Sequence, residues 1–385
     1  MIALYGDFRQ IGRAAPGAAK PSPEAKSIQS HIPQPVRIPH RFERLAAFDC
    51  VLDADRGWID LIAVRYPDLP FEPGAVSVWQ DGRRHARLTP VLVGDKGHGE
   101  SSVHLRYRTD DDVLRPGRDL TLAAGKTELP LNINRLPPAP GTIGTAVATL
   151  FKDDHWILPA WLDHYRRLGC DRFLLYYNGP LERLRAQLTG LDGEALHDCT
   201  FVQWDFAYWI EERIGLLSRR PQPRRKSPLH HAQPPHLLHT LRTFCAQWDV
   251  GWIGFFDLDE FVHFDDGTTF RTLTSQTPDR DLYLFESRWA EDRGDPDARG
   301  AGAKSALIDI YAKPVTEGPD SRTKYLVRPS RVVIPGVHRP HLLTSDTVPV
   351  HLSPDRASVL HLHNITHDRR GSFLDQRDDW RPVAI

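Results

Sequence analysis

The sequence lacks the features that mark a membrane, secreted or nucleic-acid-binding protein. No apolar run approaches the ~20 residues that span a bilayer, and Asp7 and Arg9 interrupt the first apolar stretch too early for a signal-peptide core. Neither charge is in excess, since 49 Lys and Arg against 50 Asp and Glu give a net charge of −1, which argues against a global affinity for nucleic acid or anionic lipid. These absences predict a cytoplasmic protein with no membrane span and no nucleic-acid partner.

Cysteine and lysine are scarce. The four cysteines, Cys50, Cys170, Cys199 and Cys245, form no C-x-x-C pair, so neither a zinc knuckle nor a dithiol redox motif is indicated. Cysteines this dispersed are typical of reduced, buried side chains rather than of a disulfide framework. The abundance of Arg, Ala and Pro beside little Lys is a composition typical of GC-rich bacteria.

The length of 385 residues predicts two or three domains. Prolines punctuate residues 1–41, which we expect to be extended or partly disordered. Residues 42–136 alternate short apolar segments with turn residues, among them the hairpin signal Gln80-Asp81-Gly82, and predict an all-β, sandwich-like N-terminal domain. A proline-rich linker is expected at 137–142.

Residues 143–385 follow a longer period and predict an α/β domain. Apolar runs at 144–151 and 172–178 flank a segment from Trp156 to Leu168 with helical spacing, the pattern of a βαβ unit. A second helix is expected from about Pro235 to Trp248, and residues 250–264 are expected to form one strongly apolar strand.

Three carboxylates in four positions interrupt the predicted strand 250–264. Because side chains alternate along a strand, Asp257 and Asp259 are expected to point the same way, with Glu260 next to them. Two carboxylates at the carboxyl end of a strand suit Mg²⁺ or Mn²⁺ and leave positions open for phosphate oxygens. A cation must lie near if the segment is buried. The alternative is a solvated acidic turn.

Four ordered stretches resemble glycosyltransferase family 92 and related family-2-like enzymes of the GT-A fold. They are 149–180 with Lys152-Asp153-Asp154, 231–264 with the D-x-D motif, 323–341 with Lys324, and 361–373 with His363. The resemblance implies a GT-A-like (Rossmann-like) catalytic domain that moves a hexosyl group from a nucleotide-sugar donor, a UDP-sugar above all, to a hydroxyl of a glycan or glycoconjugate. The sequence departs from the family pattern at Asp154, where Glu is usual.

The same resemblance implies roles for individual residues. Asp257 and Asp259 would hold Mn²⁺ or Mg²⁺, which stabilises charge on the departing diphosphate. His363 is the first choice for a further metal ligand and His338 the second, and a nitrogen ligand favours Mn²⁺.

Donor contacts are expected at the ends of the first strands, where doubly wound sheets bind nucleotides. The residues assigned to donor binding are Lys152, Asp154, Asn178, Gln233, Asp257 and Lys324. Asp154 also fits a plain helix N-cap. An inverting enzyme needs a general base for the acceptor hydroxyl, expected at Glu291 or Asp292, whereas a retaining enzyme needs none.

Two other function classes share parts of this pattern. A haloacid-dehalogenase-type phosphohydrolase also carries D-x-D after an apolar strand and uses the first Asp as nucleophile, but Phe261 stands where a small residue is expected. A non-catalytic carbohydrate-binding protein would use the N-terminal domain, although intact Asp257 and Asp259 argue against it. The basic segment 218–228 fits a solvated loop or a loop that closes on the donor.

Overall fold

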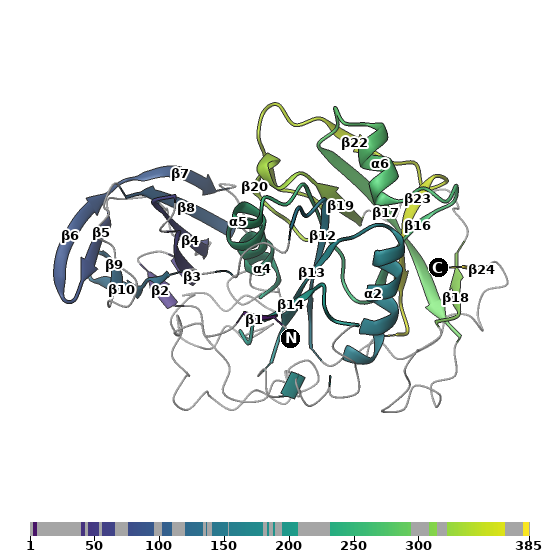
Figure 1. Ribbon diagram of the computed structural model, residues 1–385, viewed down its shortest axis with the longest axis horizontal. Coiled ribbons are helices and arrows are strands. Elements are labelled where there is room, and N and C mark those ends of the chain that lie inside the picture. The colour runs from purple at the N-terminus through teal and green to yellow at the C-terminus, as the bar shows by residue number, and fades with distance from the viewer. Residues whose placement is uncertain are drawn as a thin grey trace, which may run out of the picture.

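The structure is a computed structural model, and its strands form mixed sheets with few helices (Figure 1). It describes residues 3–5, 40–42, 45–53, 56–65, 76–95, 102–109, 120–133, 136, 141–152, 154–179, 183–184, 188, 195–206, 232–293, 308–313, 322–365 and 380–384. The basic segment 218–228 lies outside these residues. No helix within the described ranges is long and apolar enough to cross a membrane.

Two sheets between residues 40 and 133 form the N-terminal half. One has the order β11-β3-β4-β8-β7 with β2 beside β3, and the other has the order β10-β9-β5-β6. The strands are β2 His40–Phe42, β3 Leu45–Asp53, β4 Trp58–Arg65, β5 Val76–Gln80, β6 Arg83–Leu88, β7 Pro90–Asp95, β8 Ser102–Arg108, β9 Leu120–Ala124, β10 Thr127–Pro130 and β11 Asn132–Ile133. Apolar side chains from both sheets share one buried core. Positive φ angles at Asp81 and Gly82 confirm the predicted hairpin turn between β5 and β6.

The C-terminal half is built on one 12-stranded mixed sheet. Its main order is β1-β14-β13-β12-β15-β19-β17-β18-β24, with β16, β22 and β23 attached off this path. The strands are β1 Ala3–Tyr5, β12 Thr145–Phe151, β13 Arg172–Tyr177, β14 Cys199–Gln203, β15 Trp252–Phe255, β16 Glu260–Phe264, β17 Leu282–Asp292, β18 Ile310–Ala312, β19 Thr323–Val327, β22 Pro349–His351, β23 Ala357–Leu362 and β24 Arg381–Val383. A small separate ribbon pairs β20 Val332–Ile334 with β21 Leu342–Leu343. The strand β1 was not expected from the sequence, and residues 6–39 lie outside the described ranges.

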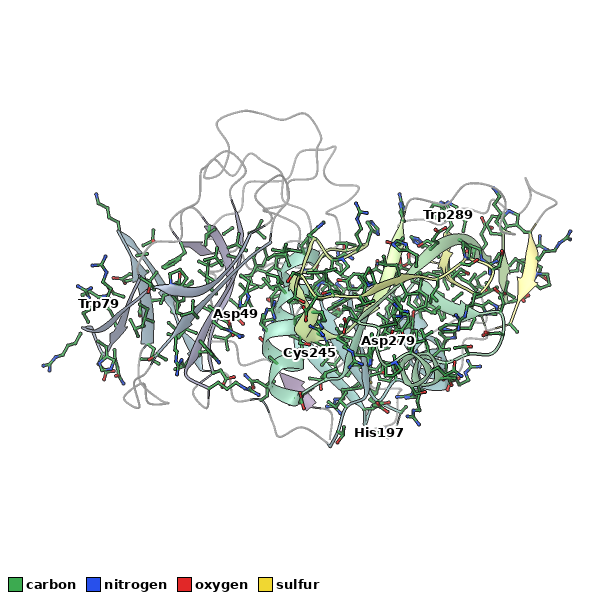
Figure 2. The ribbon with its side chains drawn as sticks, turned by 90° about the horizontal axis from the view of Figure 1, so that it is seen from above. Asp49, Trp79, His197, Cys245, Asp279 and Trp289 are labelled. Atoms are coloured by element: carbon green, nitrogen blue, oxygen red, sulfur yellow. The ribbon has the colours of Figure 1, made fainter. Side chains whose placement is uncertain are left out.

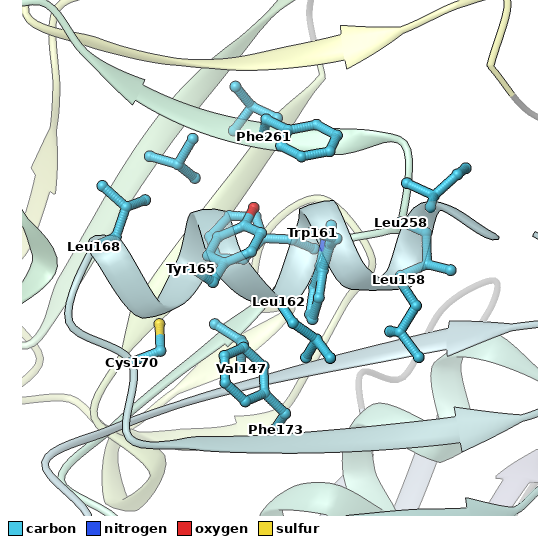
Figure 3. Close-up of a cluster of buried hydrophobic side chains, with 14 of the residues drawn as sticks. Val147, Leu158, Trp161, Leu162, Tyr165, Leu168, Cys170, Phe173, Leu258 and Phe261 are labelled. Atoms are coloured by element: carbon cyan, nitrogen blue, oxygen red, sulfur yellow. The ribbon is translucent and has the colours of Figure 1, made fainter. Parts of the chain in front are cut away.

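The predicted βαβ unit is confirmed. Strands β12 and β13 are parallel, and between them a 3₁₀ turn at His155–Ile157 leads into helix α2, Leu158–Arg167. Figure 3 shows the buried face of α2, on which Leu158, Trp161, Leu162 and Tyr165 pack against the sheet. The helix is thereby fixed beside the end of β15, where the acidic residues lie.

The second predicted helix is also confirmed, as one continuous stretch. It comprises α4 Gln233–His239, a π-helical segment η3 Thr240–Cys245 and α5 Ala246–Trp248. A further short helix, α6, covers Phe270–Gln276.

The single strand predicted for 250–264 is wrong. The segment forms two strands with different partners, because β15 pairs with β12 and β19 whereas β16 pairs with β23. Residues 256–259 connect them. Asp257 and Asp259 therefore lie in a turn, where strand alternation does not set their directions.

The two halves share buried contacts. The ring of Phe48 on β3 lies 6.2 Å from that of Trp204 and 4.8 Å from that of Phe206. His239 of α4 approaches Asp49 with its Nε2 atom 3.1 Å from Oδ2, and its Nδ1 atom is 2.7 Å from the hydroxyl of Tyr176. These contacts, together with a core cluster drawn from both halves, hold the six-stranded N-terminal sheet against α4. All four cysteines are buried and free.

A buried histidine in this region has a pKa well below its usual range. His104 Nε2 lies 2.6 Å from Asp60 Oδ1. Arg106 forms a bidentate ion pair with the same carboxylate, through Nε to Oδ1 and Nη2 to Oδ2. Burial, and then the positive charge of Arg242, lower the pKa of His104 to about 4 from the usual 6.5. Burial opposes ionisation of Asp60, but His104 and Arg106 outweigh it and lower the pKa of that carboxyl to about 2.

We expect the free energy of unfolding to fall as the pH drops from 6.5 to 4. The unfolded chain binds a proton at His104 below pH 6.5, whereas the folded chain resists protonation down to about pH 4, so the loss is about 3 kcal/mol for this histidine. Burial shifts the pKa of His164 in the same way, also to about 4. Urea unfolding followed by tryptophan fluorescence at several pH values measures the slope. A flat profile would contradict the prediction, and exposed His351→Gln is the control that should keep it.

Candidate active site

The acidic turn 256–259 is held by hydrogen bonds to its backbone. From α2, Trp161 Nε1 donates to the carbonyl of Asp257 at 3.1 Å, and the Tyr165 hydroxyl donates to the carbonyl of Glu260 at 3.0 Å. From β23, the N–H of Leu362 donates to the carbonyl of Asp259 at 2.8 Å. The backbone carbonyls are thereby anchored on both sides, and the three carboxylates are presented by a fixed loop.

A lysine ammonium lies between two of these carboxylates. Lys324 Nζ on β19 is 2.9 Å from Asp257 Oδ2 and 2.9 Å from Glu260 Oε2. The side chains of Lys324 and Glu260 are only 2% exposed, while that of Asp257 is 33% exposed. Gln233 Nε2 donates to Asp257 Oδ1 at 3.1 Å, and the N–H of Asp257 donates to Glu260 Oε2 at 2.9 Å. The geometry brings Gln233, Asp257 and Lys324 together, although they are far apart in the sequence.

The three charged residues of this cluster differ in the direction in which their pKa values are shifted. Burial alone would lower the pKa of Lys324. The negative charges of Asp257 and Glu260 outweigh burial and raise this pKa above its usual value, so the side chain stays an ammonium. Burial would raise the pKa of Asp257, but Lys324 lowers it overall. Burial raises the pKa of Glu260 in spite of Lys324, and the negative charge of Asp257 adds to the effect. Asp257 is therefore the firmly ionised, partly exposed member of the cluster.

Asp259 meets a different partner from Asp257. His361 Nε2 lies 3.3 Å from Asp259 Oδ2, and its Nδ1 atom lies 3.9 Å from Glu260 Oε1. The indole of Trp289 stacks on His361, with 5.1 Å between ring centroids, and makes an edge contact with His363 at 5.4 Å. The histidine beside the acidic turn is thus His361.

The sequence reasoning missed His361, although a signal for it was present. Strands β16 and β23 are antiparallel and place Glu260 directly opposite His361, so the two side chains share a face of the sheet. His363 follows two positions later, and its N–H donates to the carbonyl of Ala290 at 2.7 Å. The alternating Leu-His-Leu-His run at 360–363 marks both histidines for the same face, but only the strand register distinguishes them.

Other predicted donor contacts lie around the same end of the sheet. Lys152 follows β12, and Asp154 is the N-cap residue of the 3₁₀ turn, where its side chain does not accept the capping hydrogen bond. Asn178, at the end of β13, is buried and donates its amide hydrogens to the carbonyls of Trp204 and Phe206, both at 2.7 Å. The contacts of Asn178 thus join two neighbouring segments of the chain.

Glu291 and Asp292 lie at the end of β17 and are both buried. The N–H of Asp292 donates to Asn364 Oδ1 at 3.0 Å, and Asn364 Nδ2 donates to the carbonyl of Asp292 at 2.9 Å. The Asp292 carboxylate accepts a hydrogen bond from the N–H of Asp309 at 2.9 Å. His338, the second choice for a metal ligand, is exposed, and its carbonyl accepts from the Thr323 hydroxyl at 2.7 Å.

The donor chemistry fits a divalent ion at Asp259 and His361. A carboxylate oxygen and an imidazole nitrogen are a ligand pair used by Mn²⁺ and related ions, and these two lie 3.3 Å apart. The carboxylate of Asp257 is already engaged by Gln233 and Lys324. Within the described part of the chain, no group of three or more His, Cys, Asp or Glu side chains is arranged as a complete metal site. Two protein ligands would leave positions open for ligand oxygens and water.

Comparisons with known proteins identify the family. The model of glycosyltransferase family 92 matches residues 142–381. Among solved structures, HddC from Yersinia pseudotuberculosis is similar at 9% identity over 58% of this chain and 97% of that chain, with a TM-score of 0.31. An apo UDP-glucose pyrophosphorylase is similar at 10% identity over 57% of this chain and 90% of that chain, with a TM-score of 0.24.

TM-scores this low establish neither a shared fold nor a shared activity. No curated protein matches the chain. The family match stands by itself: it runs from just before β12 to the first residue of β24 and contains the acidic turn, Lys324 and His361. Because it covers more than half of the 385 residues, the chain belongs to glycosyltransferase family 92.

Proposed function

We propose that the chain is a metal-dependent glycosyltransferase whose residues 143–385 form a GT-A-like (Rossmann-like) catalytic domain. It would transfer a hexosyl group from a nucleotide-sugar, a UDP-sugar first, to a hydroxyl of a glycan or glycoconjugate. The observation that carries the proposal is the cluster of Asp257, Asp259, Glu260, Lys324 and His361 beyond the carboxyl end of β15. Ligands of open α/β sheets bind at this edge.

Asp259 and His361 are the residues that would hold Mn²⁺ or Mg²⁺, with His363 the alternative nitrogen ligand from the sequence. When bound, the ion would neutralise charge on the donor diphosphate. Asp257 is the group that would accept a hydrogen bond from the donor, because its side chain is 33% exposed and its pKa is held low by Lys324. Lys324 is too deeply buried to reach a ligand itself, so it would act as a positioning residue for Asp257.

The remaining predicted residues have supporting roles in this proposal. Lys152 and Asp154 would border the nucleotide, since they follow β12. Asn178, predicted for the same role, is buried and donates to Trp204 and Phe206, so it would position that segment beside the donor. Glu291 and Asp292 are the candidates for a general base if the enzyme inverts the anomeric carbon. Their burial requires the acceptor hydroxyl to enter beside β17.

Thermal stability in the presence of UDP tests the donor and the metal together. UDP with Mn²⁺ should raise the melting temperature by several degrees, because a ligand present at 100 times its Kd adds about 2.7 kcal/mol to the native state. UDP with EDTA, and Mn²⁺ alone, should give much smaller shifts. Equal shifts with and without the ion would reject metal-dependent donor binding. Mg²⁺-dependent hydrolysis of p-nitrophenyl phosphate without such shifts would support the phosphohydrolase alternative instead.

A further inference from the structure

The four-stranded sheet β10-β9-β5-β6 has one face in the core of the N-terminal half and one face turned outward. Val78, Leu122 and Leu129 lie in the buried core. Because neighbouring side chains on a strand alternate, Trp79 points to the opposite face, where it is partly exposed. Figure 2 shows Trp79 at the far end of the molecule from Trp289, which lies beside His361 in the candidate active site.

The strand register arranges the outward side chains in two rows. Arg84 lies opposite Trp79, Trp79 opposite Thr121, and Thr121 opposite Pro130. The second row is composed of Arg87, Ser77, Ala123 and Glu128. With strands ~4.8 Å apart, each row crosses about 14 Å. An indole therefore lies among small and polar side chains, with arginines along one edge, at a point where the β5–β6 register shifts between Val78 and Trp79.

Positive charge on this surface is concentrated along one edge of the sheet. Strand β6, the edge strand, carries exposed Arg83, Arg84 and Arg87. The acidic residues of the sheet are Asp81, in the turn, and Glu128, on the opposite edge strand β10. The chain as a whole has a net charge of −1, so the arginine edge is a specific feature and not the result of a generally basic composition.

We propose that this face, defined by Trp79, Thr121, Arg84 and Arg87 and called the Trp79 face below, binds a glycan chain that carries carboxylates. Guanidinium groups pair with carboxylates through two parallel hydrogen bonds. The indole supplies a flat apolar surface for the C–H face of a sugar ring. A glycan is favoured over single-stranded nucleic acid, because nucleic-acid grooves use several aromatic rings for successive bases and the described residues of this face include one, Trp79. The inference rests on membership of the glycosyltransferase family and not on the proposed donor or metal.

Affinity electrophoresis of the full chain tests the proposal, with polygalacturonate as the carboxylated probe and dextran as the neutral one. Polygalacturonate should retard the protein in a salt-sensitive manner, and dextran should not. Trp79→Ala, and separately Arg84→Glu with Arg87→Glu, should weaken polygalacturonate binding by about tenfold or more. Arg381→Glu is the matched control, because it reverses an exposed arginine on the edge strand β24 at the other end of the molecule.

Three results would overturn the proposal: undiminished polygalacturonate binding by the arginine variant, equal retardation by dextran, or tighter binding of single-stranded DNA than of polygalacturonate. The arginine variant alters only exposed side chains, so it remains informative if Trp79→Ala fails to fold. Neither variant should change the thermal shift produced by UDP and Mn²⁺. The electrophoresis therefore tests glycan binding even if UDP and Mn²⁺ give no thermal shift. The thermal shift likewise tests donor binding even if polygalacturonate does not bind.

Discussion

Lys324→Met should destabilise the protein by about 3–5 kcal/mol and abolish its glycosyltransferase activity. The methionine would fill a similar volume but leave Asp257 and Glu260 facing each other without the ammonium that lies 2.9 Å from each. Removing one partner of a buried ion pair leaves the desolvation cost of the other uncompensated. Urea unfolding measures the stability, and the release of UDP from a UDP-sugar measures the activity.

A double variant separates this explanation from simple loss of packing. Adding Glu260→Gln to Lys324→Met removes one of the two carboxylates that have lost the Lys324 ammonium, so part of the lost stability should return. Lys126→Met, in the exposed turn between β9 and β10, is the matched control and should change stability by no more than about 0.5 kcal/mol. If the double variant is less stable than Lys324→Met, the charge account of the cluster is wrong.

Asp259→Asn should reduce Mn²⁺-dependent donor turnover by about 100-fold or more and leave the fold intact. The substitution keeps the size of the side chain and replaces one of three neighbouring carboxyl groups by an amide, so unfolding curves should change little. Activity should be measured over a Mn²⁺ titration, because loss of a ligand raises the ion concentration needed for half-maximal activity. Asp265→Asn, a partly exposed carboxylate just after β16, is the matched control.

Histidine variants test which imidazole belongs to the site. His361→Ala should raise the Mn²⁺ requirement, since His361 Nε2 lies 3.3 Å from Asp259 Oδ2. His363→Ala should have the smaller effect, because that ring contacts the edge of Trp289. A larger effect of His363→Ala than of His361→Ala would identify His363 as the metal ligand. Full activity of Asp259→Asn would exclude a metal site at this turn.

The elements that depend on neighbours in the chain could be predicted from the sequence alone. The spacing of apolar residues gave helix α2 and the helix from α4 to α5, and the dipeptide Asp81-Gly82 gave the β5–β6 hairpin. The D-x-D motif marked the acidic residues, but on an expected strand rather than in the turn where they lie. Such features follow from helix and strand periods and from the φ angles that turn residues allow, which are local properties.

Tertiary structure decided what those elements bring together. Strand β15 ends at Phe255, and the turn that follows places the carboxylate of Asp257 beside Gln233 and Lys324. The pairing of β16 with β23 places His361 beside Asp259. Tertiary structure also packed the six-stranded N-terminal sheet against α4, and it placed Phe48 of that sheet against Trp204. These contacts join residues tens to hundreds of positions apart, and they are set by strand register and by the need to neutralise buried charge. A local sequence pattern predicts neither the strand register nor the partner of a buried charge.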